Sequence, residues 1–93
     1  MKSEEYINAM KDEYIQKMIK NLPVLRASIG LTQRQLGKKV GVSRQTIVAI
    51  ENKKHSLSWS LYLSIICVFF QYEETKLLLD NLEVFSDELI HKL

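Results

Sequence analysis

The chain has 93 residues and a mass of 10.9 kDa, which is the size of one small domain. Apolar residues make up 46% and charged residues 26%, a balance that favours a folded soluble protein over a disordered tail. A single cysteine excludes an intramolecular disulfide and favours a reducing compartment, and the two histidines lie too far from it in the sequence to suggest a structural zinc site.

The sequence gives no sign of export or of a membrane segment. Residues 1–6 contain two acids and no apolar signal region. The densest apolar run, residues 57–70, is interrupted by serines and is too short to span a bilayer. We therefore expect a cytoplasmic protein without metal, cofactor or membrane contact, and no small-molecule substrate is evident.

The first predicted helix spans residues 3–20, because aromatic and methionine side chains recur at every fourth position. These side chains are Tyr6, Met10, Tyr14 and Met18. Pro23 disfavours helical geometry at the residue before it, so we expect a break or kink near Asn21. A second helical segment then runs to Ile29, with Gly30 as its C-cap.

Two short helices are predicted next, each with a recognisable beginning. Thr32 and Gln35 have the spacing of a capping box, and the helix that they open stops at Gly41. Ser43 is the predicted N-cap of the following helix, which runs to about Asn52.

A polar, basic loop over residues 53–57 separates these helices from the rest of the chain. Three more helices are predicted: one from Ser56 or Ser58 to near Phe70, one over residues 75–82 and one over residues 86–93. No strand pattern competes with them. The sequence therefore predicts an all-α protein, a compact bundle of five to six helices with extra N- and C-terminal helical segments.

We expect a single domain over residues 1–93, with three parts that differ in charge. The parts are an N-terminal helix (1–20), a central core (21–72) and an acidic C-terminal segment (73–93) that could mediate dimerisation. The net charge is −2 over residues 1–13, +8 over residues 14–72 and −4 over residues 73–93. A basic middle between acidic ends makes a nucleic acid a candidate partner.

Residues 33–52, QRQLGKKVGVSRQTIVAIEN, have the pattern of two helices that meet across a short turn. Two pairs of apolar residues can face one core, namely Leu36 with Val40 and Ile47 with Ile50. Gly37 is expected where the second helix crosses closest, and Gly41 where the chain turns with positive φ. Val42 would close the bottom of the turn. The central core is thus predicted to contain a helix-turn-helix.

Burial of the two isoleucines determines which residues of the second helix face outward. At about 100° per residue, Ala49 lies about 40° from Gln45, whereas Ile47 and Ile50 lie about 200° and 140° away. In this motif the first turn of the second helix points into the major groove. Arginine can bind guanine, glutamine can bind adenine, and small apolar side chains can contact a thymine methyl. The predicted base-contacting residues are Arg44, Gln45, Val48 and Ala49.

The string LRASIGLTQRQLGKKVGVSRQTIVAIENKK resembles the Xre-like family of phage-repressor and Cro-type DNA-binding domains, and the resemblance extends over roughly residues 22–70. It implies that Gln33 contacts a backbone phosphate and steadies the first reading residue, and that Arg26 and Glu51 form a partly buried ion pair. It further maps phosphate contacts to Thr32, Asn52 and Lys54. Lys53 stands where the family often has glycine, and Ser58 and Trp59 stand where it frequently has a proline.

The remaining basic and apolar residues have more ordinary interpretations. Lys53 and Lys54 lie in the loop after the reading helix, so at least one of them is expected to contact the DNA backbone. Lys38 and Lys39 are expected to be solvated. Four residues of the 57–70 run are expected in the core: Trp59, Tyr62, Cys67 and Phe70.

The terminal segments carry more apolar residues than we expect one small chain to hide. The C-terminal segment carries Leu78, Leu82, Phe85, Leu89, Ile90 and Leu93. We expect a homodimer formed through this segment, ahead of the N-terminal helix, because operators are usually read by two-fold dimers. The alternative is that the two terminal segments pack on each other or on the central core within one chain.

The sequence leads to one main functional hypothesis and one alternative. The main hypothesis is a sequence-specific regulator of transcription that binds double-stranded DNA. The alternative is an antitoxin-type or other protein-interaction module, whose acidic, apolar tail over residues 73–93 masks a basic partner while the central module binds DNA for autoregulation. An enzyme is not expected, because no paired carboxylates, activated nucleophile, phosphate loop or metal cluster can be assembled from these residues.

Overall fold

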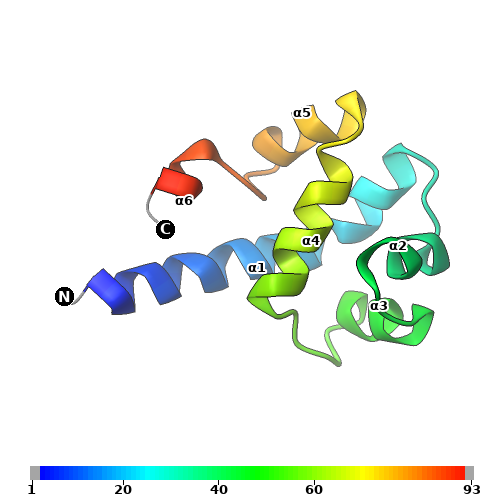
Figure 1. Ribbon diagram of the computed structural model, residues 1–93, viewed down its shortest axis with the longest axis horizontal. Helices are drawn as coiled ribbons and strands as arrows, with labels where there is room; N and C mark the ends of the chain where they lie inside the picture. The colour runs from blue at the N-terminus through cyan, green and yellow to red at the C-terminus, as the bar shows by residue number, and fades with distance from the viewer. Residues whose placement is uncertain (1–2, 92–93) are drawn as a thin grey trace.

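The computed structural model describes residues 3–91, apart from the side chain of Ile90, and these residues form six helices without a strand (Figure 1). The helices are α1 (Ser3–Ser28), α2 (Gln33–Val40), α3 (Arg44–Glu51), α4 (Trp59–Phe69), α5 (Glu73–Asn81) and α6 (Asp87–His91). The predicted all-α class is confirmed. No helix of the described chain combines the length and the apolarity needed to cross a bilayer.

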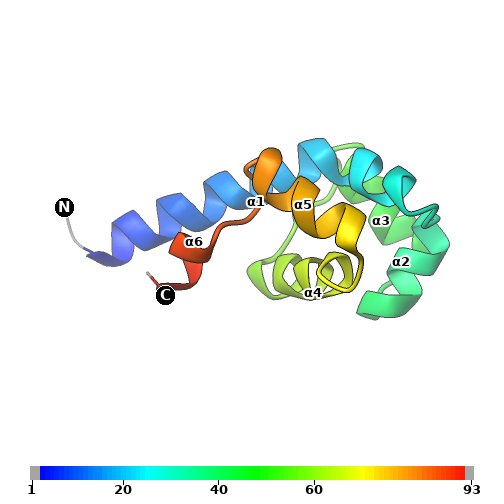
Figure 2. The ribbon, with the colours of Figure 1, turned by 90° about the horizontal axis from the view of Figure 1, so that it is seen from above.

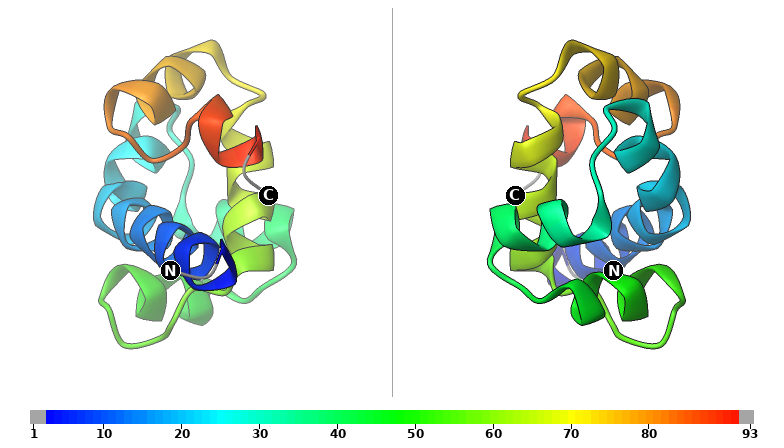
Figure 3. Two further views of the ribbon diagram at one scale, coloured as in Figure 1. Left: turned by 90° about the vertical axis from the view of Figure 1, so that its left-hand side faces the viewer. Right: turned by 90° about the vertical axis from the view of Figure 1, so that its right-hand side faces the viewer.

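The other helices pack along α1, which runs along most of the length of a molecule that measures 41 × 28 × 19 Å (Figures 1 and 2). Helices α2 and α3 pack against each other at one end, and α4 crosses α1 beside them. Seen from either end, α5 lies on the opposite side of the molecule from α3 (Figure 3). Helix α6 lies beside the N-terminal half of α1 (Figures 1 and 2).

Short polar side chains begin α2, α3 and α4, as their sequence positions predict. Thr32 accepts a hydrogen bond from the Gln35 N–H at 3.0 Å, and Gln35 accepts one from the Thr32 N–H at 2.9 Å, which completes the predicted capping box. Ser43 and Ser58 cap α3 and α4 in the same way, by accepting from the N–H three residues ahead. Gly41 ends α2 in the left-handed region with φ 83°.

Helix α1 continues through Pro23, so the predicted helix break near Asn21 is wrong. A proline removes one backbone hydrogen bond and crowds the preceding turn. Here Leu22, directly before the proline, and Leu25, two residues after it, are fully buried, while Pro23 itself faces solvent. The Asn21 amide also donates to the Lys17 carbonyl at 2.8 Å. Burial in the core therefore outweighs the local preference of the proline.

Gly37 makes the close approach that the sequence predicts, but its neighbour is the turn rather than the body of α3. A Cβ atom at this position would lie 2.6 Å from the carbonyl oxygen of Val42 and 3.3 Å from the backbone of Ser43. The absence of a side chain lets the turn fold back onto α2, where the Val42 N–H donates to the Gly37 carbonyl at 2.9 Å. The geometry of the turn therefore depends on this glycine.

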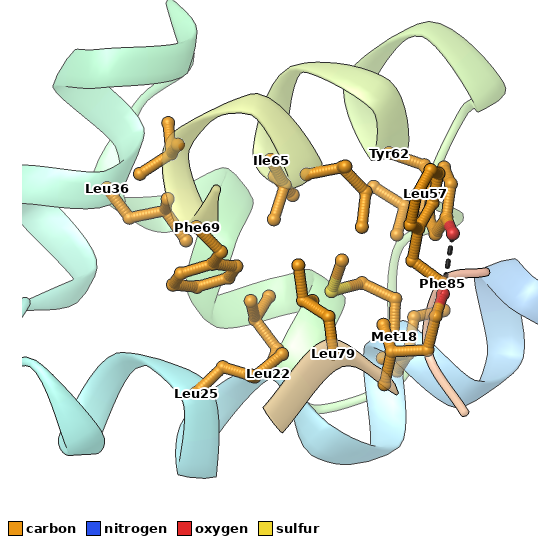
Figure 4. Packing of buried hydrophobic residues seen from close by; sticks show 14 of the residues in the cluster. Met18, Leu22, Leu25, Leu36, Leu57, Tyr62, Ile65, Phe69, Leu79 and Phe85 are labelled. Atoms are coloured by element: carbon orange, nitrogen blue, oxygen red, sulfur yellow. Dashed lines mark hydrogen bonds between the residues drawn. The ribbon is translucent and has the colours of Figure 1, made fainter. Parts of the chain in front are cut away.

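One hydrophobic cluster joins the helices, and Figure 4 shows part of it. Leu36 of α2 and both isoleucines of α3, Ile47 and Ile50, are fully buried in this cluster. Tyr62 of α4 is also fully buried, and its hydroxyl donates to the Val84 carbonyl at 2.6 Å. This bond connects α4 to the segment between α5 and α6.

Most apolar side chains of the terminal segments are hidden within the chain, which is the alternative that the sequence left open. Leu89 is 1% exposed and Phe85 is 6% exposed, and Leu78 and Leu82 pack partly buried against the same cluster. The N-terminal stripe takes part as well, since the Tyr14 hydroxyl lies 2.9 Å from the Ser86 hydroxyl. For the four described residues of the predicted C-terminal set, the expectation that one chain cannot hide them is wrong. The Ile90 side chain and Leu93 lie outside the described residues.

Cys67 in α4 and Phe70 directly after it are more exposed than the sequence predicts. Cys67 was expected in the core but is exposed, because it lies about 140° around the helix from the buried Tyr62, on the side of Ser64. Phe70 was expected in the core as well, but it caps the C-terminal end of α4 and is 39% exposed. Trp59 is half-buried and stacks on Tyr62, with ring centroids 4.9 Å apart.

We expect Gly37→Ala to lower the free energy of unfolding by about 1–3 kcal/mol, because relieving the clash with the turn costs more than the higher helix propensity of alanine returns. Urea unfolding followed by circular dichroism measures this change. Lys38→Ala, an exposed neighbour on the same helix, is the control and should change stability by less than about 0.5 kcal/mol. A Gly37→Ala variant as stable as the wild type would contradict the role of the close approach.

Burial raises the pKa of Tyr62 above its ordinary value of 10.0. Above about pH 10 the unfolded chain loses this proton while the folded chain keeps it, so stability should fall as the pH rises further. Thermal midpoints measured from about pH 8 to about pH 11 should therefore decline more steeply for the wild type than for Tyr62→Phe. Equal slopes for the two proteins would show that this hydroxyl does not contribute.

Candidate nucleic-acid interface

The face of α3 opposite its buried isoleucines carries the residues that the sequence singled out for base contact. Ile47 and Ile50 are 0% exposed, which fixes the rotation of the helix about its axis. Arg44 and Gln45 are consequently exposed in its first turn. Val48 and Ala49 are half-buried, at the rim of the same face. Two long polar side chains therefore stand at the N-terminal end of α3, beside two small apolar ones.

A carboxylate at the other end of α3 holds the three helices of this region together. Glu51 accepts hydrogen bonds from Nε and Nη2 of Arg26, at 2.7 and 2.9 Å. The Arg26 and Glu51 side chains are only 15% and 6% exposed. Gln33 of α2 donates to the same carboxylate at 3.0 Å. The ion pair thus connects α1 to α3, and the glutamine adds α2.

A basic hollow of about 660 Å³ opens where the end of α1 and the starts of α2 and α3 come together. It is lined by Arg26, Thr32, Gln33, Arg34, Gln35 and Arg44. Thr32 and Gln33, which the family resemblance assigns to phosphate, thus lie next to the first base-reading candidate. The hollow also faces the N-terminal end of α2, whose backbone dipole favours anions.

Thr32 and Gln33 each keep a hydrogen-bond donor available for a ligand. The Thr32 hydroxyl oxygen accepts the capping bond from Gln35, so its hydrogen can still be donated. Gln33 uses one amide hydrogen on Glu51 and retains the second. The network therefore orients Gln33 without exhausting its capacity to bind phosphate.

Arg34 is a residue of this hollow to which sequence reasoning gave no role. It is exposed and lines the hollow together with Arg44. Its place two residues after the N-cap is the signal that could have identified it, because helical side chains lean toward the N-terminal end of their helix.

The loop after α3 brings the other predicted phosphate contacts to the far end of the reading helix. Asn52, Lys53 and Lys54 are all exposed. Lys53 adopts φ 61°, the left-handed conformation that glycine usually takes at the end of a helix. The N–H groups of Lys53 and Lys54 donate to the carbonyls of Ile50 and Ala49, at 3.0 and 2.8 Å. The lysine therefore completes the same helix ending that a glycine would give.

Positive charge predominates on the surface around α3. Its only acid, Glu51, is neutralised by Arg26, while Arg34, Arg44 and Lys54 remain exposed. Lys38 and Lys39 of α2 are exposed, as predicted. Within the described part of the chain, no cluster of histidine, cysteine and acidic side chains could hold a metal ion.

Comparison with known proteins points to one family. A family model described as helix-turn-helix matches residues 25–69. The chain is 41% identical over 63 residues to a protein of Archaeoglobus fulgidus named as an uncharacterised HTH-type transcriptional regulator, a match that covers 68% of this chain and 81% of the relative. It is 50% identical over 48 residues to a protein of the same description from Methanocaldococcus jannaschii, covering 52% of this chain and 73% of the relative.

No solved structure gives a significant match to the chain. The matched family region begins within α1 and ends with α4, so it contains the capped pair α2 and α3 as well as the Arg26–Glu51 ion pair. The geometry of these helices and the two relatives agree: the chain belongs to the Xre and Cro type of the helix-turn-helix family.

Proposed function

We propose that the protein is a sequence-specific regulator of transcription that reads the major groove of double-stranded DNA with α3. The observation that carries this proposal is the rotation of α3: full burial of Ile47 and Ile50 leaves Arg44 and Gln45 exposed at the end of the helix that enters the groove in this motif. The names of the two relatives support the same class of function. A regulator of this kind acts in the cytoplasm, beside the DNA that it binds.

The dimensions of α3 and the positions of its flanking residues support this mode of binding. With its side chains an α-helix is about 10–12 Å across, which fits the roughly 12 Å width of the major groove. Thr32 and Gln33 lie beside the start of α3, and residues 52–54 follow its end. Phosphate contacts from both sets would hold α3 between the two backbones, and Arg34 joins the first set. Base contacts by Arg44, Gln45, Val48 and Ala49 would then supply the choice of sequence.

We further propose that two copies bind together as a homodimer. One eight-residue reading helix contacts only a few base pairs, which is too few to specify an operator. Proteins with this motif usually bind as two-fold dimers to half-sites about one DNA turn apart. Selection of bound sequences from random duplexes, followed by sedimentation of the complex, tests this. An inverted repeat bound by two chains is the expected result, and a single asymmetric site bound by one chain would contradict it.

Arg44→Ala should cost about 1–3 kcal/mol on the selected sequence and relax the preference at one base position, because arginine makes a bidentate contact with guanine. Fluorescence anisotropy with the selected duplex and with duplexes altered at each position measures the effect. Lys76→Ala on α5 removes one positive charge at the opposite side of the molecule and is the matched control. Equal losses on selected and random DNA would show that Arg44 does not read a base.

Lys54→Ala should behave differently, since a phosphate contact carries no sequence information. We expect weaker binding to all duplexes alike, and a plot of log affinity against log salt whose slope is shallower by about one unit. Titrations at several salt concentrations measure this slope. A loss confined to the selected sequence, with the salt slope unchanged, would exclude a phosphate contact by this lysine.

A further inference from the structure

A groove of about 480 Å³ between α5 and the start of α6 has no part in the interface described above. Phe70, Leu77 and Phe85 supply its apolar lining, and the two phenyl rings meet edge to face with centroids 5.2 Å apart. Leu77 is 67% and Phe70 39% exposed. Half of the exposed large apolar side chains of the described residues therefore lie at this one groove.

Acidic side chains border the apolar surface. Glu73, Asp80 and Asp87 line the groove, against Lys76 as its one basic residue. Within residues 3–91, none of these three carboxylates takes part in a salt bridge. The groove therefore offers an apolar floor with an excess of unneutralised negative charge at its rim.

This charge discriminates between the possible occupants. A two-fold dimer through the groove would bring the carboxylates of one copy toward the same carboxylates of the other, which is unfavourable. DNA and an anionic membrane surface are repelled for the same reason. A helix with apolar side chains along one stripe and basic side chains beside it would match both the floor and the rim.

The position of the groove allows such a helix to bind while α3 is on DNA. Helices α5 and α3 lie on opposite sides of the molecule in Figures 1 and 3. We propose that the groove formed by Phe70, Leu77 and Phe85 docks a basic amphipathic helix of a partner protein, so that a protein rather than a small molecule communicates with the regulator. This goes beyond DNA binding, and neither activity requires the other.

The test uses the full chain and two synthetic, fluorescently labelled helical peptides. Both carry leucine at positions i, i+3, i+4 and i+7; one has lysine at the remaining positions and the other has glutamate. Anisotropy titrations with the wild type are expected to show saturable one-to-one binding of the lysine peptide and no binding of the glutamate peptide. Binding of both peptides with similar affinity would overturn the proposal, because it would show that the acidic rim does not select the ligand.

Paired variants locate the binding site. Leu77→Ser should weaken binding of the lysine peptide by about tenfold or more, whereas Val24→Ser, which alters another exposed apolar side chain, on α1, should leave it unchanged. Asp80→Asn should weaken it by about threefold and reduce its salt dependence, whereas Asp12→Asn on α1 should not. Equal effects within either pair would place the peptide elsewhere and contradict the proposal.

Two further measurements separate docking from folding and from DNA binding. Leu77→Ser and Asp80→Asn are expected to keep the thermal midpoint and the DNA affinity of the wild type, so a loss of peptide binding reports on the groove alone. Sedimentation velocity gives the other decisive outcome. A wild-type dimer that Leu77→Ser converts to a monomer would show that a second copy covers the groove, and would overturn the assignment to a basic partner.

Discussion

The Glu51 carboxylate is the contact that fastens the reading helix to α1 and α2. It is almost completely buried and accepts hydrogen bonds from Arg26 of α1 and Gln33 of α2. Removing one partner from a buried ion pair costs about 3–5 kcal/mol, because the remaining charge is left without compensation. The same carboxylate orients an amide proposed to bind phosphate, so contact with the DNA backbone and the orientation of α3 are linked through one side chain.

The parts of the fold that follow from local chemistry could be predicted from the sequence. The caps at Thr32, Ser43 and Ser58 depend on side-chain oxygens and backbone N–H groups a few residues apart, and they lie where they were expected. The buried face of α3 depends on the spacing of Ile47 and Ile50, which also determines the exposed face. The outline of the candidate interface was therefore accessible without coordinates.

The features that could not be predicted depend on contacts between distant segments. Pro23 disfavours a helix locally, but α1 continues through it because Leu22 and Leu25 are buried in the core. That burial cannot be read from the sequence. Cys67 lies in an apolar run, but its exposure depends on which side of α4 meets the core. The terminal segments could be understood only once the contact between Tyr14 and Ser86 showed that α1 and the start of α6 lie together. The acidic groove beside α5 arises from this same packing.

The backbone of Lys53 shows what the chain gives up at the junction after α3. A side chain in the left-handed region costs roughly 1–2 kcal/mol, a strain that glycine would avoid. In return, a permanent cation sits at the negative pole of the helix dipole, close to where a polyanion would pass. At this position a glycine would give the lower backbone energy and a lysine the stronger attraction to DNA, and the chain has the lysine.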